Sequence, residues 1–161
     1  MNVKDDNPDN FQTILDAISN IDKTREHLDN LLKLKCFNYW QIKMDEDFGK
    51  HRFVKEVIPE YQNLSRYPKV GILIEVNDIS FSILVEATTS PYYGIGRHNA
   101  SDNIDEKVTA LLSGIVEHIK PDKWWYWNED TTYLDAYNDF KELANQIIRY
   151  LENKISEQQI S

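Results

Sequence analysis

The stretches VGILIEV (Val70–Val76), ND (Asn77–Asp78) and ISFSILVEA (Ile79–Ala87) give the strongest secondary-structure signal in the chain. Both long runs are apolar and rich in β-branched residues, which favours β-strands. The Asn-Asp pair between them predicts a tight hairpin, because both side chains tolerate a positive φ. In the second run Phe, Ile and Val alternate with Ser, Leu and Glu, so we expect one face of the sheet to be more buried than the other.

Weaker signals lie on both sides of this hairpin. YYGIGR (Tyr92–Arg97) predicts a third strand, whose two glycines indicate a bulge or a close backbone approach. CFNYWQIKM (Cys36–Met44) alternates loosely and predicts a strand ahead of the hairpin. Phe53–Tyr61 predicts a short helix that Pro59 ends.

A helix is expected from Asn10, which suits a capping position. Its apolar residues recur at alternating steps of three and four: Phe11, Ile14, Ile18, Ile21, Leu28 and Leu32. Such a narrow stripe is typical of a helix that packs along another helix, in the same chain or in a partner. We expect first an ordinary core helix and second a homodimer through this helix. Arg25 interrupts the stripe and is expected near an edge of the contact, because burying its charge is costly.

Two further helices are expected, the first from Asn103 to Pro121 and the last from Thr132. The apolar face of the last helix comprises Leu134, Tyr137, Phe140, Ala144, Ile147, Ile148, Leu151 and Ile155. The order helix, strands, helices predicts an α+β fold, an antiparallel β-sheet with a central hairpin packed on one face by the N-terminal helix and the two C-terminal helices. Residues 1–9 are expected to be a disordered acidic tail, and residues 10–158 a single domain.

The composition restricts the class of protein. The chain has 161 residues, 41% of them hydrophobic, which suits one domain with a core. No apolar run reaches the roughly 18 residues that a membrane span needs, and the acidic start does not resemble a secretory signal. The single cysteine, Cys36, cannot form an intramolecular disulfide, so we expect a free thiol and a cytoplasmic protein.

Charge argues against direct binding to nucleic acid. The net charge is −9, whereas affinity for DNA or RNA comes largely from neutralising phosphates. Residues 33–69 are the exception, with eight Lys and Arg against five acids. A basic segment in an acidic body is compatible with one anionic contact, although solvated loops and strand faces are the commoner explanation of such a segment.

Motifs for catalysis or cofactor binding are weak. The four histidines form no metal-binding spacing, Cys36 has no neighbouring base, and Gly94-Ile95-Gly96 is too short for a nucleotide-binding loop. We therefore assign no catalytic residue and no cofactor, and expect a protein that is not an enzyme.

The acids Glu75, Asp78 and Glu86 lie on or beside the hairpin and offer one alternative, a metal-dependent nuclease of the PD-(D/E)xK type. Such a site needs an acid on one strand and Glu-x-Lys on the next, to hold Mg²⁺ and orient water. Glu86 is followed by Ala87 and Thr88, so the Lys is missing. Solvent-facing strand acids are the simpler interpretation.

The run Trp124-Trp125-Tyr126-Trp127 is the most distinctive feature. On a strand, alternate side chains point to opposite faces, so either Trp124 and Tyr126 or the other two residues point outward. Outward aromatics suit protein interfaces and stacking platforms, although a helix covering them is an equal alternative. The candidate binding residues are Trp124, Tyr126, Tyr92 and Tyr93.

Residues 68–158 carry a resemblance to a known family. The order of apolar hairpin, Tyr-Tyr-Gly-Ile-Gly (Tyr92–Gly96), helix, Trp-Trp-Tyr-Trp (Trp124–Trp127) and long closing helix is similar to the C-terminal, non-catalytic half of some bacterial PD-(D/E)xK nuclease superfamily proteins. The catalytic acids and Lys of that family have no counterpart here, so no functional residue is carried over. The resemblance implies an accessory region that serves substrate docking or assembly.

These observations favour a non-enzymatic acidic protein-binding module of a bacterium or phage. Its expected partner has a basic surface and acts on nucleic acid, as a nuclease, a restriction or CRISPR-type effector, or a toxin would, and binding inhibits or regulates it. The alternatives are the metal-dependent nuclease or a degenerate relative of it, with Glu75, Asp78 and Glu86 as ligands, and a domain that binds a nucleotide or small ligand.

Overall fold

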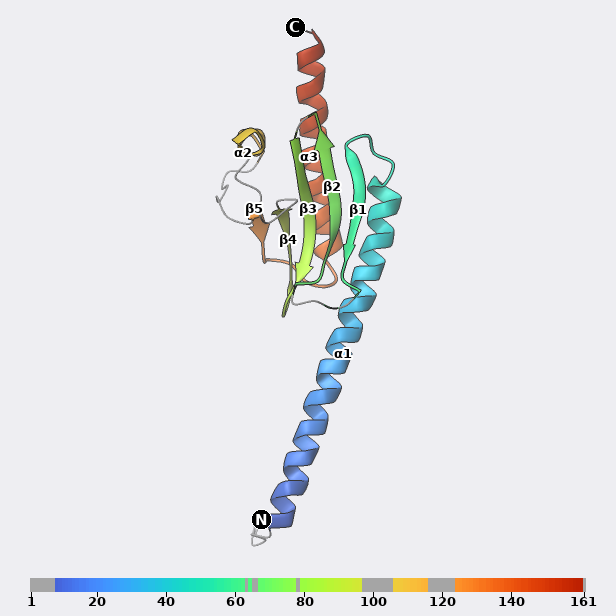
Figure 1. Ribbon diagram of the computed structural model, residues 1–161, viewed down its shortest axis with the longest axis vertical. Helices are drawn as coiled ribbons and strands as arrows, with labels where there is room; N and C mark the ends of the chain where they lie inside the picture. The colour runs from blue at the N-terminus through green and yellow to red at the C-terminus, as the bar shows by residue number, and fades with distance from the viewer. Residues whose placement is uncertain are drawn as a thin grey trace.

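The computed structural model describes residues 8–62, 64, 67–77, 79–96, 106–115 and 124–160. The chain has an α+β fold, as predicted, with an N-terminal helix, a five-stranded sheet and two C-terminal helices (Figure 1). Its elements are α1 (Pro8–Phe48), β1 (Val54–Glu60), β2 (Lys69–Val76), β3 (Ile79–Ala87), β4 (Pro91–Gly96), α2 (Glu106–Ser113), β5 (Trp124–Asn128) and α3 (Ala136–Ile160). Among the described residues no helix carries an apolar stretch that would let it traverse a bilayer.

The sheet is antiparallel throughout, and its strands lie in the order β1-β2-β3-β4-β5. The predicted hairpin is its centre, because β2 and β3 pair from Val76 opposite Ile79 to Lys69 opposite Glu86. Asn77 adopts a φ of 52° in the turn, as expected of an Asn at this position. Its neighbour Asp78 lies outside the described residues. The predicted third strand is confirmed as β4.

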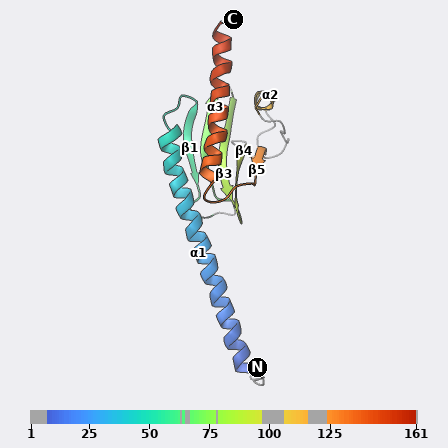
Figure 2. The same ribbon diagram turned by 180° about the vertical axis from the view of Figure 1, so that it is seen from behind.

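The core lies between the sheet and the helices α1 and α3, which run along one face of it (Figure 2). We call this the inner face and the opposite one the outer face. The strands β2 and β3 contribute Val70, Ile72, Ile74, Phe81, Ile83 and Val85, all fully buried. From the helices come mainly Phe37, Trp40, Met44, Phe140, Ile147 and Leu151, and α2 adds Val108 and Leu112 to the same core.

The predicted strand at Cys36–Met44 is wrong, because this segment is the last part of the 41-residue helix α1. Its buried residues Phe37, Trp40 and Met44 recur at steps of three and four, which is the helical period. The predicted strand rested on Phe37 and Tyr39, which are two positions apart and fit an alternation, whereas the buried residues follow the helical period. Asn10 is not a cap either, because it lies within the helix.

The predicted helix at Phe53–Tyr61 is also wrong, because these residues form the edge strand β1. Pro59 was expected to end a helix. It lies instead in a strand that pairs only with β2, where a residue without an N–H is tolerated. The register shifts between Val54 and Glu56, which marks a bulge at the start of the strand.

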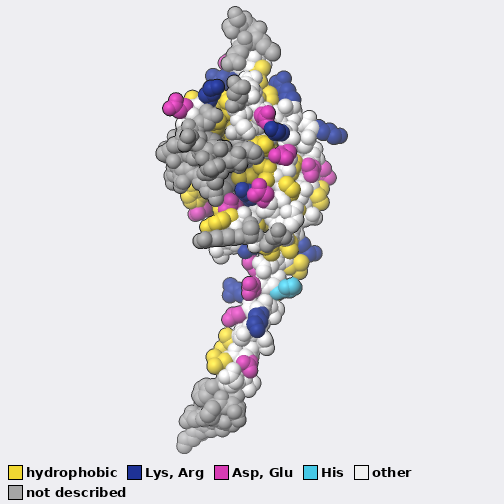
Figure 3. Space-filling model, in the orientation of Figure 1, with side chains coloured by type: hydrophobic (Ala, Val, Ile, Leu, Met, Phe, Trp, Pro, Cys, Tyr) yellow, Lys and Arg dark blue, Asp and Glu magenta, His cyan; other side chains and the backbone are white. Residues whose placement is uncertain are grey.

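The N-terminal half of α1 extends away from the sheet and packs against none of it (Figure 1). Every described side chain from residue 12 to residue 28 is exposed, so the expectation of an ordinary core helix is wrong for this half. Large apolar side chains point into solvent along it: Ile14, Leu15, Ile18, Ile21, Leu28, Leu31 and Leu32 (Figure 3).

The start of α3 agrees with the sequence. The Thr132 hydroxyl oxygen accepts hydrogen bonds from the backbone N–H groups of Leu134 (3.2 Å) and Asp135 (3.3 Å), as a residue at a helix start does. Leu134 was expected on the buried face of this helix, but it lies in the preceding turn and is 90% exposed. The expected ends of the previous helix, Asn103 and Pro121, fall outside the described residues.

A polar contact joins the two long helices at the rim of the core. The Asp47 carboxylate of α1 accepts a hydrogen bond from the Tyr137 hydroxyl of α3 (2.5 Å) and forms an ion pair with Lys141 (2.6 Å). The hydrogen bond from Lys141, and next the one from Tyr137, hold the pKa of Asp47 below its usual value. The charged form of Asp47 therefore stabilises the contact between α1 and α3.

A substitution of Trp40 tests whether this residue lies at the centre of the core. Its ring packs edge-on against Phe37 (5.0 Å between centroids), stacks on Tyr133 (6.1 Å) and is 1% exposed. Replacing Trp40 by Ala should lower the free energy of unfolding by about 3–5 kcal/mol, because it leaves a large cavity. Denaturant unfolding measures this change. Leu134→Ala is the control and should change the free energy by less than about 0.5 kcal/mol. Equal effects of the two substitutions would contradict this packing.

The lowered pKa of Asp47 predicts that the stability of the fold depends on pH. A carboxyl whose pKa is lowered in the folded state stabilises the fold above its unfolded pKa, and this stabilisation is lost as the pH falls through the folded value. Asp47→Asn should therefore destabilise the protein at pH 7, and the difference from the unchanged protein should shrink toward pH 3. Urea unfolding at a series of pH values measures it. A difference that stays constant with pH would show that the charge of Asp47 contributes nothing.

Candidate functional site

The outer face of the sheet carries the side chains that the core does not use. Strand register aligns two neighbouring rows across this face. The first row consists of Ile58, Gly71, Leu84, Gly94 and Trp127, and the second of Glu60, Lys69, Glu86 and Tyr92. In β3 the outward residues Ser82, Leu84 and Glu86 are as buried as the inward ones, so the expected difference in burial between its two faces is wrong.

Glu86 is a buried carboxylate, 2% exposed, at the centre of the second row. The hydroxyl of Tyr92, directly opposite on β4, donates a hydrogen bond to it. Burial, and next this hydrogen bond, raise the pKa of the Tyr92 phenol. Lys69 lies opposite Glu86 on β2, but its ammonium forms an ion pair with Glu60 (3.1 Å). Glu86 and Tyr92 thus form a polar contact that ties β3 to β4.

Trp127 is the exposed aromatic residue at the β5 end of the outer face, with 39% of its surface accessible. Its ring lies edge-on to that of Tyr92, with 6.4 Å between centroids and 71° between planes. The following residues Glu129 and Asp130 are exposed acids. An aromatic side chain held by a neighbouring ring and bordered by charge is typical of an anchor residue in a protein interface.

Gly94 of β4 allows strand β5 to pair closely with β4. It lies opposite Trp127, and a Cβ atom on it would be 2.1 Å from the carbonyl oxygen of Tyr126. No side chain fits at that distance, so glycine is required here. The sequence interpretation of this glycine as a close backbone approach is confirmed.

The four predicted binding residues do not form one surface. Tyr92 is on the outer face, whereas Tyr93 and Tyr126 point inward and are half-buried against the core. The Tyr93 hydroxyl accepts a hydrogen bond from the Asn128 side-chain amide (3.3 Å). Trp124 belongs to β5, and its side chain lies outside the description. Sequence reasoning did not select Trp127. Alternation allowed either Trp124 and Tyr126 or Trp125 and Trp127 to point outward, and only the pairing of β4 with β5 decides between these two possibilities.

The acids of the nuclease alternative are not brought together. Glu75 lies opposite Ser80 and forms an ion pair with Lys55 (2.5 Å), whereas Glu86 lies opposite Lys69. Lys69 and Glu75 are six positions apart along β2, so the two acids are separated by roughly 20 Å along the strands. Asp78 is outside the described residues. Within the described part of the chain, no three His, Cys, Asp or Glu side chains are grouped so that they could hold a metal ion.

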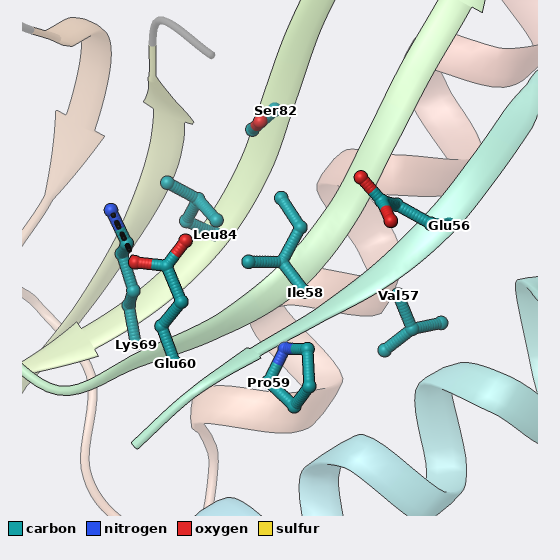
Figure 4. A pocket seen from close by; sticks show the side chains of 8 residues that line it. All are labelled: Glu56, Val57, Ile58, Pro59, Glu60, Lys69, Ser82 and Leu84. Carbon is teal, nitrogen blue, oxygen red and sulfur yellow. Dashed lines mark ion pairs between the residues drawn. The ribbon is translucent and has the colours of Figure 1, made fainter. Parts of the chain in front are cut away.

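A small pocket opens on the outer face between β1, β2 and β3, with a volume of about 180 Å³ (Figure 4). The lining residues are Glu56, Val57, Ile58, Pro59, Glu60, Lys69, Ser82 and Leu84. Pockets for small ligands usually measure about 300–1,000 Å³. Its one cation, Lys69, is already paired with Glu60, so this pocket gives little support to nucleotide binding.

Cys36 does not have the environment of a nucleophile. It is half-buried on α1, and burial raises the pKa of its thiol. A catalytic cysteine needs the opposite shift, because the thiolate is the reactive form. The interpretation of Cys36 as a free thiol without a catalytic role agrees with this environment.

Tyr92→Phe tests the contact with Glu86. The substitution keeps the ring against Trp127 and removes the hydroxyl that donates to a buried carboxylate. We expect a loss of about 1–3 kcal/mol in the free energy of unfolding. Tyr39→Phe is the matched control, because Tyr39 is 53% exposed and should lose little. Equal stabilities of the Tyr92 variant and the unchanged protein would show that this hydrogen bond contributes nothing.

The chain was compared with family models, curated proteins and solved structures. Two motifs of the resemblance described above, Tyr92–Gly96 and Trp124–Trp127, lie side by side as β4 and β5. The accessory role that this resemblance implies stays an expectation. None of the three comparisons finds a match.

Proposed function

We propose that this protein is a non-catalytic protein-binding module that regulates a partner acting on nucleic acid. The observation that carries the proposal is Trp127, an exposed aromatic residue on strand β5, in ring contact with Tyr92 and close in sequence to the exposed acids Glu129 and Asp130. Buried aromatic anchors with a polar rim dominate the binding energy of many protein interfaces.

The charge of the chain supports a partner with a basic surface. A net charge of −9 attracts such a surface over a distance of about one Debye length and speeds association. Proteins that act on DNA or RNA carry basic surfaces because they neutralise phosphates. An acidic module that covers such a surface competes with nucleic acid for it, and inhibition or regulation is the direct consequence.

The chemistry of the described residues adds support for a role without catalysis. Glu86 accepts a hydrogen bond from Tyr92, and Glu75 forms an ion pair with Lys55. Asp47 forms an ion pair with Lys141 and accepts a hydrogen bond from Tyr137. These carboxylates are used within the fold and are far from one another in the sheet and helices. Binding is therefore the function that this arrangement supports best.

The proposal predicts a partner whose capture depends on Trp127. The tagged chain, incubated with a lysate of its source organism, should retain a protein with a basic surface. Trp127→Ala should weaken the purified complex by on the order of thirtyfold, as loss of an interface anchor does. Leu134→Ala, another exposed apolar side chain, is the matched control and should bind normally. Calorimetry measures the affinities, and circular dichroism checks the fold.

Two further readouts decide the proposal. Higher salt should slow association, because charge attraction drives the encounter. Addition of the chain should lower the activity of the partner on DNA or RNA. If Trp127→Ala and the unchanged protein bind the partner equally, this surface is not the contact. If the purified chain itself cleaves nucleic acid, the protein is an enzyme and the proposal fails.

A further inference from the structure

The apolar stripe on the exposed side of α1 is longer than the sequence analysis indicated. One series spaced by seven residues comprises Ile14, Ile21, Leu28, Lys35 and Ile42, and a second comprises Ile18, Arg25, Leu32 and Tyr39. Tyr39 and Ile42 belong to the part of α1 that packs on the sheet, yet they are 53% and 49% exposed. The stripe therefore continues along the solvent side of the domain.

One face of α1 packs on the sheet and the opposite face is exposed to solvent. Phe37, Trp40 and Met44 point into the core, and Tyr39 and Ile42, about 200° further round the helix, point away from it. Tyr39 touches the ring of Tyr137 on α3 at one edge (6.3 Å between centroids) but stays 53% exposed, so the core contacts leave most of the stripe uncovered. A regular repeat of seven with apolar residues at two positions is the pattern of a helix that pairs with another helix in a coiled coil.

The projecting half of α1 also needs a partner to be stable. Helices in water are only marginally stable without packing, even when their sequence favours the helix. Residues 12–28 are exposed on all sides and contain several residues with low helix propensity, including Asn20, Asp22 and Thr24. The five apolar stripe residues Ile14, Ile18, Ile21, Leu28 and Leu32, with Leu15 beside them, would gain most from being covered.

Charge decides the orientation of the two helices. In a parallel pair, each residue of the stripe meets its own copy, so Arg25 would face Arg25 and Lys35 would face Lys35. Like charges in the seam of a coiled coil are costly, because neither is compensated. In an antiparallel pair these residues meet other residues, and both like-charge layers disappear.

One antiparallel register covers the whole stripe. It places Ile14 opposite Tyr39 of the copy, Ile21 opposite Leu32, and Arg25 opposite Leu28. In this register the guanidinium of Arg25 lies beside Asp29, which follows Leu28 on the flank of the seam. Lys35 lies opposite Ile18, where its long side chain can extend past the apolar contact into water.

We propose that α1 pairs with a second copy of this chain as an antiparallel coiled coil, with Arg25 of each copy beside Asp29 of the other. The stripe of one copy is thus covered by α1 of the second copy, which runs in the opposite direction. The inference is independent of the proposed function, because it uses neither the outer face nor Trp127.

The first test is the mass of the purified full chain in solution, measured by sedimentation equilibrium. The expected mass is about twice the 19.0 kDa of one chain. Ile21→Asp places a charge in the seam and should raise the dimer dissociation constant by on the order of hundredfold. Ser19→Asp is the matched control, because it adds the same charge outside the stripe and should leave the dimer intact. A monomer or a higher oligomer for the unchanged chain would overturn the proposal, as would equal effects of the two substitutions.

The second test determines the orientation. In a Cys36→Ser background, Ile21→Cys and Leu32→Cys chains are oxidised separately and after mixing. The antiparallel register predicts disulfide-linked dimers after mixing and none from either variant alone. Linked dimers formed efficiently by Ile21→Cys alone would show a parallel pair and overturn the register. Binding of the partner by Trp127 is measured separately, so failure of either proposal leaves the other testable.

Discussion

The contact between the last part of α1 and the inner face of the sheet is the interaction on which the rest of the structure depends. Phe37 and Trp40 are its centre, and they connect three parts of the chain. Phe37 stacks on Tyr61 after β1 (5.5 Å), and Trp40 stacks on Tyr133 ahead of α3 (6.1 Å). The Tyr61 hydroxyl donates to Gln41 (2.6 Å) and anchors the same end of the helix. With this contact in place α1 has a fixed direction, and the outer face and the projecting half of α1 remain available for other contacts.

Much of the fold could be predicted from local signals. The hairpin at Val70–Ala87, the strand at Tyr92–Gly96 and the start of the last helix at Thr132 follow from side-chain chemistry that acts over a few residues. The errors at Cys36–Met44 and Phe53–Tyr61 have a different cause. Both segments are short, mix apolar and polar residues, and fit a period of two about as well as a period near four. Long-range packing decided between the two, because Phe37, Trp40 and Met44 reach the sheet only from a helix, and Val54–Glu60 finds backbone partners only as a strand.

The candidate site could be predicted only in part. The aromatic run at Trp124–Trp127 and the tyrosines at Tyr92 and Tyr93 were visible in the sequence, but the face that each occupies depends on how β4 pairs with β5. That register places Trp127 opposite Gly94 and turns Tyr126 toward the core. The burial of Glu86 could not be predicted from the sequence either. A strand acid is usually solvated, yet this one is buried because Tyr92 on the next strand provides a donor. No local pattern identifies such a partner, because its position is set by strand pairing.

The unbroken helix α1 has a thermodynamic consequence. The same 41 residues run from the hydrophobic core of the domain to the exposed stripe without a hinge. Any molecule that binds the stripe and has no affinity for the unfolded chain must therefore raise the apparent melting temperature of the sheet, and by an amount that increases with the concentration of that molecule. Folding and association are in this way a single linked equilibrium. The heat stability of this domain is a property of the solution in which it is measured as well as of the sequence.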